Sequence, residues 1–425
     1  MRVLWVCNVM LPSASALFNR RAAPYGGWLT GALNGLCSVK SEIKLGICFP
    51  LDGAGEVQKR ESEGIAYYGF PGGGRVTDKS GAKPHLREII DDFKPDILHV
   101  HGTEYAHSLA AAEAFSAPEK TLVSIQGLCF EYAKHYFAGL PLSVVHGFNP
   151  RDMLKRENLS LQRKQFVLRG ENEIKLLKQV RHVSGRTDWD RACALSVNPD
   201  LNYHFCNETL RETFYTKRWE IEKCEKHTIF ASSCSYPIKG FHRLLEAMPQ
   251  VLRSFPDARV FVPGRSPLEL PTYKLPAYPK YLRRLILKHG LAEKVIFCGT
   301  LDEEGMAERY LKSNVFLLPS AIENSPNSLG EAMLLGVPCV AADVGGVNNI
   351  LVHGREGFVY QHDSVTMLAH YICEIFENEA LARRFSENAS RHARLTHDRA
   401  KNASRLIEIY EAILEHARHE RRLVF

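Results

Sequence analysis

Short apolar runs alternate with longer amphipathic segments along the whole chain. In the first half, the runs that look like strands lie at residues 3–9, 44–49, 65–70, 96–102, 121–127, 182–185 and 202–206. Several of them are apolar on both faces, which is typical of parallel strands covered by helices on each side. Segments of helical length separate them, at residues 28–37, 85–93 and 106–114. The alternation predicts an α/β fold with a parallel sheet.

The second half of the chain repeats this alternation. Its strand candidates lie at residues 227–233, 258–263, 294–298, 315–319, 338–342 and 357–360, and its helix candidates at 241–252, 281–289, 304–312 and 328–335. The proline-rich stretch 267–280 is predicted as a surface loop, and residues 364–418 as helical throughout.

The length of 425 residues predicts two domains, because single hydrophobic cores rarely grow past about 250–300 residues. We place the boundary in the charged stretch 216–226. The predicted domains are residues 1–220 and 221–395, followed by a C-terminal helix at 396–425 that packs back on the first domain.

Composition and charge narrow the function classes. The chain is 45% hydrophobic, and its 54 basic and 48 acidic residues leave a net charge of only +6, which is too mild to predict nucleic-acid binding. None of the eleven cysteines has C-x-x-C spacing, which argues against a zinc site and favours reduced thiols. The first apolar run is too short for a signal peptide or a membrane span, so we expect a cytoplasmic protein.

A basic amphipathic helix pair is predicted at residues 151–180, where lysines and arginines alternate with glutamates. Two interpretations stay open. The segment is either a solvated helix face or a peripheral contact with the inner face of a membrane.

The strongest chemical signal lies in residues 316–338, which read as a strand, a polar loop and a helix. Ser325 fits the N-cap of that helix with Pro326 at its first position, and Gly336 fits its end. The free N–H groups near Asn327 and Ser328 then face the carboxyl end of the strand. Such a helix start binds phosphate or polar hydroxyls.

Two glutamates flank this turn with seven residues between them. Glu323 lies in the loop, and Glu331 lies about two turns along the helix. Carboxylates accept hydrogen bonds from neighbouring hydroxyls, which suits sugar and ribose diols.

This pattern resembles the E-x7-E motif of the retaining family 4 glycosyltransferases, of the group 1 type. The resemblance continues through residues 341–346 and 353–358, although Val347, Asn348 and Asn349 stand where the family usually has a glutamate after paired glycines. It implies the GT-B arrangement, which is two facing Rossmann-like domains with a deep cleft between them. It also implies that Glu331 holds the donor ribose and that Glu323 contacts the transferred sugar. Donor contacts are implied for Asn324, Ser325, Asn327 and Ser328.

A second region that matches the family is Lys239-Gly240, where the family has G-R-L-x-x-x-K-G. The resemblance gives Lys239 the task of neutralising the departing diphosphate. The family's arginine falls at Cys234, so that charge is missing or comes from elsewhere. Arg265, after the next strand, is the candidate replacement.

Two further places belong to the first half of the chain. Gly26-Gly27 opens a helix after the first predicted strand, where the family often has a glycine pair near the donor phosphates. His101 and Gln126 end two successive strands and are candidates for the acceptor side of the cleft. Gln126 cannot act as a base, which excludes that role at its position.

Taken with the resemblance, the sequence predicts an enzyme that transfers a hexose-type sugar from a nucleotide-sugar donor, with retention, to a saccharide or lipid-linked acceptor. We expect a role in cell-surface polysaccharide synthesis. We expect neither a metal nor a cofactor. Two alternatives stay open. One is a catalytically weak sugar-nucleotide-binding scaffold, and the other a nicotinamide-dependent dehydrogenase, against which no G-x-G-x-x-G follows the first strand.

Overall fold

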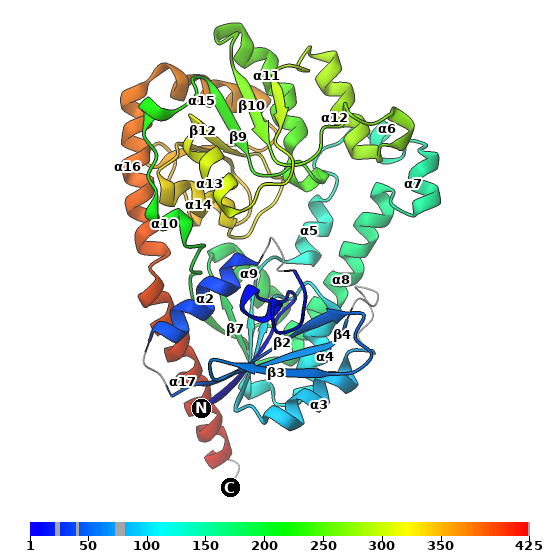
Figure 1. Ribbon diagram of the computed structural model, residues 1–425, viewed down its shortest axis with the longest axis vertical. Helices are drawn as coiled ribbons and strands as arrows, with labels where there is room; N and C mark the ends of the chain where they lie inside the picture. Colours follow the sequence, from blue (N-terminus) through cyan, green and yellow to red (C-terminus); the bar gives the residue numbers. More distant parts are fainter. Residues whose placement is uncertain (22–25, 40–41, 73–80, 424–425) are drawn as a thin grey trace. The chain divides into compact units, whose positions relative to one another are not determined.

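The chain forms two compact units (Figure 1). The computed structural model describes residues 1–21, 26–39, 42–72 and 81–423. The first unit consists of Met1–Glu131, Gln165–Thr209 and His397–Phe425, and the second of Tyr132–Lys164 and Leu210–Thr396. No helix in the described ranges is both long and apolar enough to cross a membrane.

The first unit is built on an eight-stranded sheet in the order β3-β4-β2-β1-β5-β6-β7-β8. The strands are β1 (Arg2–Val6), β2 (Lys44–Asp52), β3 (Gln58–Ser62), β4 (Ile65–Gly72), β5 (Ile97–His101), β6 (Thr121–Ser124), β7 (His182–Gly185) and β8 (Asn202–Phe205). Neighbouring strands are parallel except β3, which pairs antiparallel with β4 at the edge. The pattern of apolar positions does not predict β3, because its polar sequence has no apolar face.

Helices cover both faces of this sheet, because successive residues of a strand point to opposite sides. Leu4 and Val6 of β1 join one core with α3 (Lys83–Phe93), α4 (Ala106–Phe115), α8 (Leu159–Gln179) and α9 (Asp188–Val197). Val3 and Trp5 join the other core with α1 (Pro12–Ser15), α2 (Gly27–Ser38) and α17 (Arg399–Leu423). The C-terminal helix therefore packs on the first unit.

The second unit has a six-stranded parallel sheet in the order β11-β10-β9-β12-β13-β14. Its strands are β9 (Thr228–Ala231), β10 (Arg259–Val262), β11 (Val295–Phe297), β12 (Val315–Leu318), β13 (Cys339–Ala342) and β14 (Gly357–Tyr360). Its helices include α6 (Leu142–Val145), α7 (Pro150–Lys155), α10 (Thr213–Thr216), α11 (Phe241–Ser254), α12 (Ala277–Lys288), α13 (Glu303–Leu311), α14 (Asn327–Leu335), α15 (Val365–Glu377) and α16 (Glu379–Thr396). The predicted class of two parallel-sheet α/β domains is confirmed.

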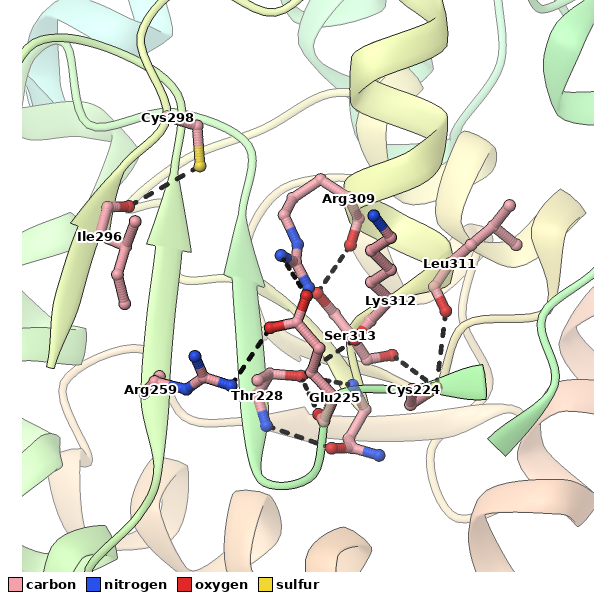
Figure 2. Close-up of polar contacts among 11 residues, drawn as sticks. Cys224, Glu225, Thr228, Arg259, Ile296, Cys298, Arg309, Leu311, Lys312 and Ser313 are labelled. Carbon is pink, nitrogen blue, oxygen red and sulfur yellow. Dashed lines mark hydrogen bonds and ion pairs between the residues drawn. The ribbon is translucent and has the colours of Figure 1, made fainter. Parts of the chain in front are cut away.

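The amino ends of β9 and β10 are tied together by an ion-pair cluster (Figure 2). Glu225 accepts from Arg259 at 3.2 Å and from Arg309 at 2.9 Å, and the Arg309 guanidinium lies 3.8 Å from the centre of the Phe261 ring. These charges hold the edge of the sheet opposite to the one at which the predicted site residues follow the strands.

The boundary between the units lies earlier than the predicted stretch 216–226, between Thr209 and Leu210. The charged run at residues 217–223 is not a free linker. The Trp219 indole N–H donates to the Ser313 carbonyl at 2.8 Å, and the Trp219 backbone N–H donates to Leu335 at 2.8 Å. A buried tryptophan thus fastens this run to the second unit.

Residues 132–164 belong to the second unit, and not to the first as the predicted domain boundaries had them. The predicted basic helix pair is present as α7 and α8, but α8 runs across the boundary. The chain is held by buried polar contacts. Asn149 Nδ2 donates to the Leu275 carbonyl, and Asp152 accepts from the Ala277 backbone N–H at 2.7 Å. Since α12 begins at Ala277, the predicted loop at 267–280 is wrong for its last four residues.

Candidate functional site

The donor residues predicted in the second half of the chain gather where the strand order of the second sheet reverses, whereas Gly26 and Gly27 belong to the first unit. Strands β9 and β12 are neighbours, with Ala231 paired to Leu317, and the chain leaves them toward opposite edges of the sheet. Such a reversal opens a crevice outside the carboxyl ends of the strands, which is where open α/β sheets bind ligands. The loop after β9 carries Lys239, and the loop after β12 carries Glu323.

Lys239 and Glu323 form an ion pair that joins these two loops. Lys239 Nζ donates to Glu323 Oε1 at 2.6 Å, and Ser320 Oγ donates to the same oxygen at 2.7 Å. Burial disfavours the ammonium of Lys239, but the charge of Glu323 raises its pKa above the ordinary value. Lys239 is therefore a cation at neutral pH, held on a carboxylate that is 5% exposed.

Two glycines let the loops come this close. Gly240 has φ of +67°, and a Cβ there would lie 1.8 Å from the Pro319 carbonyl oxygen. Gly345 has φ of +52°, and its Cβ would lie 1.9 Å from the Glu323 carbonyl oxygen. Any side chain at either position would push away the loop that carries Glu323.

Helix α14 begins one residue later than predicted. Its N-cap is Pro326, with φ of −69° and ψ of 115°, and not Ser325. The Pro326 carbonyl accepts from the N–H groups of Leu329 and Gly330, and proline has no N–H to leave unpaired at this position. The predicted end is confirmed, since Gly336 has φ of +83° and its N–H donates back to Ala332 and Met333.

The first turn of α14 presents backbone donors to the crevice side. The N–H groups of Asn327 and Ser328 have no partner within the helix, because they belong to its first turn. Just before it, the Asn324 backbone N–H donates to the Tyr132 hydroxyl at 3.2 Å. The structure thus brings Asn324, Ser325, Asn327 and Ser328 together on one turn beside Glu323.

Glu331 is buried and paired with Arg211, a residue that the sequence analysis did not single out. Arg211 donates to Glu331 Oε1 from Nε at 2.9 Å and from Nη2 at 2.7 Å, and its guanidinium lies 4.7 Å from the centre of the Phe214 ring. Burial raises the pKa of Glu331 to about 7, and Arg211 opposes the rise. Arg211 precedes every strand of this sheet, so no strand pattern pointed to it.

Neither Cys234, which stands at the family's arginine position, nor Arg265, the candidate replacement, supplies an unpaired positive charge here. Burial raises the pKa of Cys234 to about 11, so its thiol is neutral, and its Sγ lies 3.5 Å from the Pro263 carbonyl oxygen. Arg265 is exposed, and its Nε donates to Glu269 at 3.0 Å. Where the family usually has a glutamate after paired glycines, Val347 is buried and the Asn348 side chain donates to Asp343.

The predicted residues of the first unit meet in a separate small cavity of about 50 Å³ at the carboxyl ends of its strands. His101 lines it, and its two ring nitrogens have no hydrogen-bond partner within the described part of the chain. Burial lowers the pKa of His101 to about 3, so the ring is neutral. Gln126 also lines the cavity and donates to Glu208 at 2.6 Å.

Two lining residues of this cavity were missed. Arg186 follows β7, Glu208 follows β8, and the two form an ion pair. His101 and Gln126 were singled out because polar residues at the ends of parallel strands are site candidates. The same rule applies to Arg186 and Glu208. The glycine pair lies where it was predicted: Gly26 is the N-cap of α2 with φ of +86°, Gly27 is the first helical residue, and Trp28 lines the cavity.

Comparison with known proteins gives this arrangement a context. Residues 213–392 match the family described as "Glycosyl transferases group 1". The chain is 27% identical over 189 residues to a phosphatidyl-myo-inositol mannosyltransferase of Mycobacterium leprae, covering 44% of this chain and 47% of that protein. It is 30% identical over 193 residues to a D-inositol 3-phosphate glycosyltransferase of Streptomyces avermitilis, covering 44% and 39%. The matches thus span about half or less of these relatives.

Solved structures resemble the whole chain. A sucrose-phosphate synthase from Thermosynechococcus elongatus superimposes with a TM-score of 0.68 at 15% identity, covering 98% of this chain and 99% of that one. Anabaena HepE in complex with UDP and glucose gives 0.64 at 14% identity, covering 97% and 100%. At these identities the likeness shows the fold alone, which is GT-B.

Proposed function

Because residues 213–392 of this chain match the group 1 glycosyl transferases, we propose that the protein is a retaining glycosyltransferase. It moves a hexose-type sugar from a nucleotide-sugar donor to a hydroxyl group of a saccharide or lipid-linked acceptor. The observation that carries this is the pairing of Lys239 with Glu323 beside the first turn of α14, with Glu331 about one turn along the helix.

Each group has a task in this proposal. Lys239 and the first-turn N–H groups of α14 neutralise the diphosphate as it leaves, which is electrostatic stabilisation of developing charge. Glu331 accepts hydrogen bonds from the ribose, and Glu323 from the transferred sugar. Before the donor binds, each of these carboxylates is paired with a cation, Glu323 with Lys239 and Glu331 with Arg211, so that no charge is left buried without a partner charge at these two pairs.

Retention needs no protein nucleophile in this scheme. The departing phosphate oxygen accepts the proton of the acceptor hydroxyl on the face from which the leaving group departs. The glycosidic bond to the phosphate breaks as the bond to the acceptor oxygen forms on the same face. No metal is required, because Lys239 and the helix start carry the charge compensation.

The acceptor is proposed as a saccharide or a lipid-linked saccharide, with the protein acting in cell-surface polysaccharide synthesis at the cytoplasmic face of a membrane. Support comes from the mycobacterial relative, whose name describes a lipid acceptor. The neutral His101 and Gln126 in the first-unit cavity are the residues that we assign to the acceptor side.

The donor is identified by a thermal-shift panel of UDP-, GDP- and ADP-sugars, because a ligand that binds only the folded state raises the melting temperature. UDP-sugars come first in the panel, since HepE was solved with UDP and glucose. A panel in which no nucleotide sugar raises the melting temperature would contradict the proposal.

Catalysis is tested with Lys239→Ala and Glu331→Ala in excess chelator. We expect the wild type to keep its activity with chelator and Lys239→Ala to lose about 10²–10³-fold in kcat. Arg265→Ala is the matched comparison, because it removes a cation held by Glu269; a comparable loss there would identify Arg265 as the replacement cation. The anomeric proton of the product reports the stereochemistry. Near-normal turnover in both Lys239→Ala and Glu331→Ala would contradict the assignment.

A second candidate is a sugar-nucleotide-binding protein of weak activity. The neutral Cys234 at the expected arginine position favours it, because one cation of the diphosphate site is then missing. A clear thermal shift with a nucleotide sugar, together with neither transfer nor donor hydrolysis, would select this candidate.

A further inference from the structure

An exposed groove of about 660 Å³ lies in the second unit, formed between the α6–α7 segment and helix α12. Figure 1 shows α6 and α7 beside α12. None of the residues assigned to the donor site lines it. Its walls are both apolar and cationic, with Phe148, Lys280, Arg284, Leu287 and Lys288 among the lining residues.

One stripe of α12 supplies most of these side chains. Lys280, Arg284, Leu287 and Lys288 are spaced by four, three and one residues, which puts them on the same face of a helix. They are exposed, whereas Tyr278, Leu282 and Ile286 on the opposite face are buried. The exposed stripe therefore carries three cations around a leucine that is 57% exposed.

The positive charge of this surface is locally uncompensated. Between Glu269 and Glu293 the sequence has five lysines and arginines and no acidic residue, whereas the whole chain is nearly balanced at 54 basic to 48 acidic. In the described part of the chain, no carboxylate pairs with Lys280, Arg284 or Lys288. The stripe attracts anions from solution.

Large apolar side chains stand in solvent beside these cations. Phe148 lines the groove and is 77% exposed. Leu142 and Tyr273 each adjoin a lining residue and are 74% and 72% exposed. Exposed aromatic and aliphatic groups next to basic ones are typical of surfaces that lie in a membrane interface.

The segment that presents Phe148 is firmly held and is not a loose loop. Asp152 is 1% exposed, and its carboxylate accepts from Asn149, Arg151 and the Ala277 backbone N–H that begins α12. A carboxylate at the start of a helix also stabilises that helix, because its negative charge interacts favourably with the helix dipole. The apolar groups and the cations thus sit on one preformed surface, and little ordering is needed to use it.

We propose that this surface, the α6–α7/α12 groove, docks the protein on an anionic phospholipid bilayer. Lipid phosphates pair with Lys280, Arg284 and Lys288, while Phe148 and Leu287 enter the boundary between headgroups and acyl chains. A nucleic acid would satisfy the cations and leave these apolar groups in water. Docking does not depend on the transferase activity, although it would bring the enzyme to lipid-linked acceptors.

The test is co-sedimentation of the full chain with phosphatidylcholine vesicles, with and without phosphatidylglycerol. We expect binding only to the anionic vesicles, weakened by added salt because screening shortens the reach of the charges. Lys280→Glu/Lys288→Glu should weaken binding at least about tenfold, since each basic residue near the surface contributes and each reversal adds repulsion. Phe148→Ser/Leu287→Ser should also release the protein from anionic vesicles.

Lys226→Glu/Arg253→Glu is the matched control. It reverses two exposed cations outside the groove and should bind like the wild type. Melting temperature and the shift caused by a nucleotide sugar are measured for every variant, so that a failure of membrane binding is separated from a failure of the donor site. Absence of binding to anionic vesicles, or equal loss in the control, would overturn the proposal; the first result would point to a protein partner.

Discussion

At the scale of single residues, Glu331 combines burial with the task of holding ribose hydroxyls. A charged carboxylate accepts stronger hydrogen bonds than a neutral one, but burial raises its pKa to about 7. Arg211 opposes this rise and keeps part of the population ionised at neutral pH. The strength of donor binding should therefore depend on pH in the physiological range.

We predict that the affinity for the preferred nucleotide falls as the pH drops through about 7, because protonation removes the charge of Glu331. Between pH 8 and pH 6 the dissociation constant should rise by up to about tenfold, the limit for one proton on a group of this pKa. Calorimetric titration across this range measures it.

Glu331→Gln should bind more weakly and lose this pH dependence, since glutamine does not titrate. Glu269→Gln, which removes the charge of the exposed partner of Arg265, is the control and should keep the pH dependence of binding. An unchanged pH profile in Glu331→Gln would show that another group titrates.

At the scale of elements, the donor site depends on how closely two loops approach. Gly240 touches the Pro319 carbonyl, and the loop after β12 begins there. Gly290 offers a matched comparison, because its φ of +65° nearly equals the +67° of Gly240 while nothing lies within 4 Å of its Cβ position. The pair separates backbone strain from steric displacement.

Gly290→Ala should cost about 1–2 kcal/mol of unfolding free energy, the strain of a left-handed alanine. Gly240→Ala should cost more and also weaken nucleotide binding, because its Cβ displaces the loop of Glu323. Urea unfolding and the thermal-shift panel measure the two effects. Equal stability and normal binding in both variants would disprove the role of this close approach.

Much of the fold was predictable, because buried parallel strands such as β12 are continuous apolar runs and end at polar loops. The turn from Glu323 to Glu331 was predictable since its proline and terminal glycine act locally. What could not be predicted depends on partners far away in the chain. Arg211 reaches Glu331 across 120 residues, and Asn149 reaches Leu275 across 126. The strand β3 could not be predicted for a different reason, since an exposed edge strand needs no apolar pattern.

At the scale of the whole molecule, the first unit joins the two ends of the sequence in one core. The Tyr410 hydroxyl on α17 accepts from the Trp5 indole N–H at 2.9 Å and lies 2.6 Å from His99 Nδ1. Leu406, Ile409 and Ile413 of the same helix are buried in that core. The helix therefore completes the first unit.

Tyr410→Phe should lower the free energy of unfolding by about 1–3 kcal/mol, because it leaves the buried Trp5 and His99 without their shared partner. Tyr273→Phe removes the same hydroxyl from an exposed ring and should stay within about 0.5 kcal/mol of the wild type. Urea unfolding measures both. A similar cost in the two variants would mean that the buried hydroxyl contributes no more than an exposed one.

The place of α17 in the first unit also has a consequence for how the protein is made. The strands of that unit leave the ribosome early, but the face of β1 that includes Trp5 waits for a helix that begins at Arg399. At about 5–20 residues per second, translating the chain from Leu210 to Ile413 takes roughly 10–40 s. The nascent chain therefore carries an apolar sheet face that α1 and α2 cover only in part through most of its synthesis, and it is there that molecular chaperones are expected to engage it.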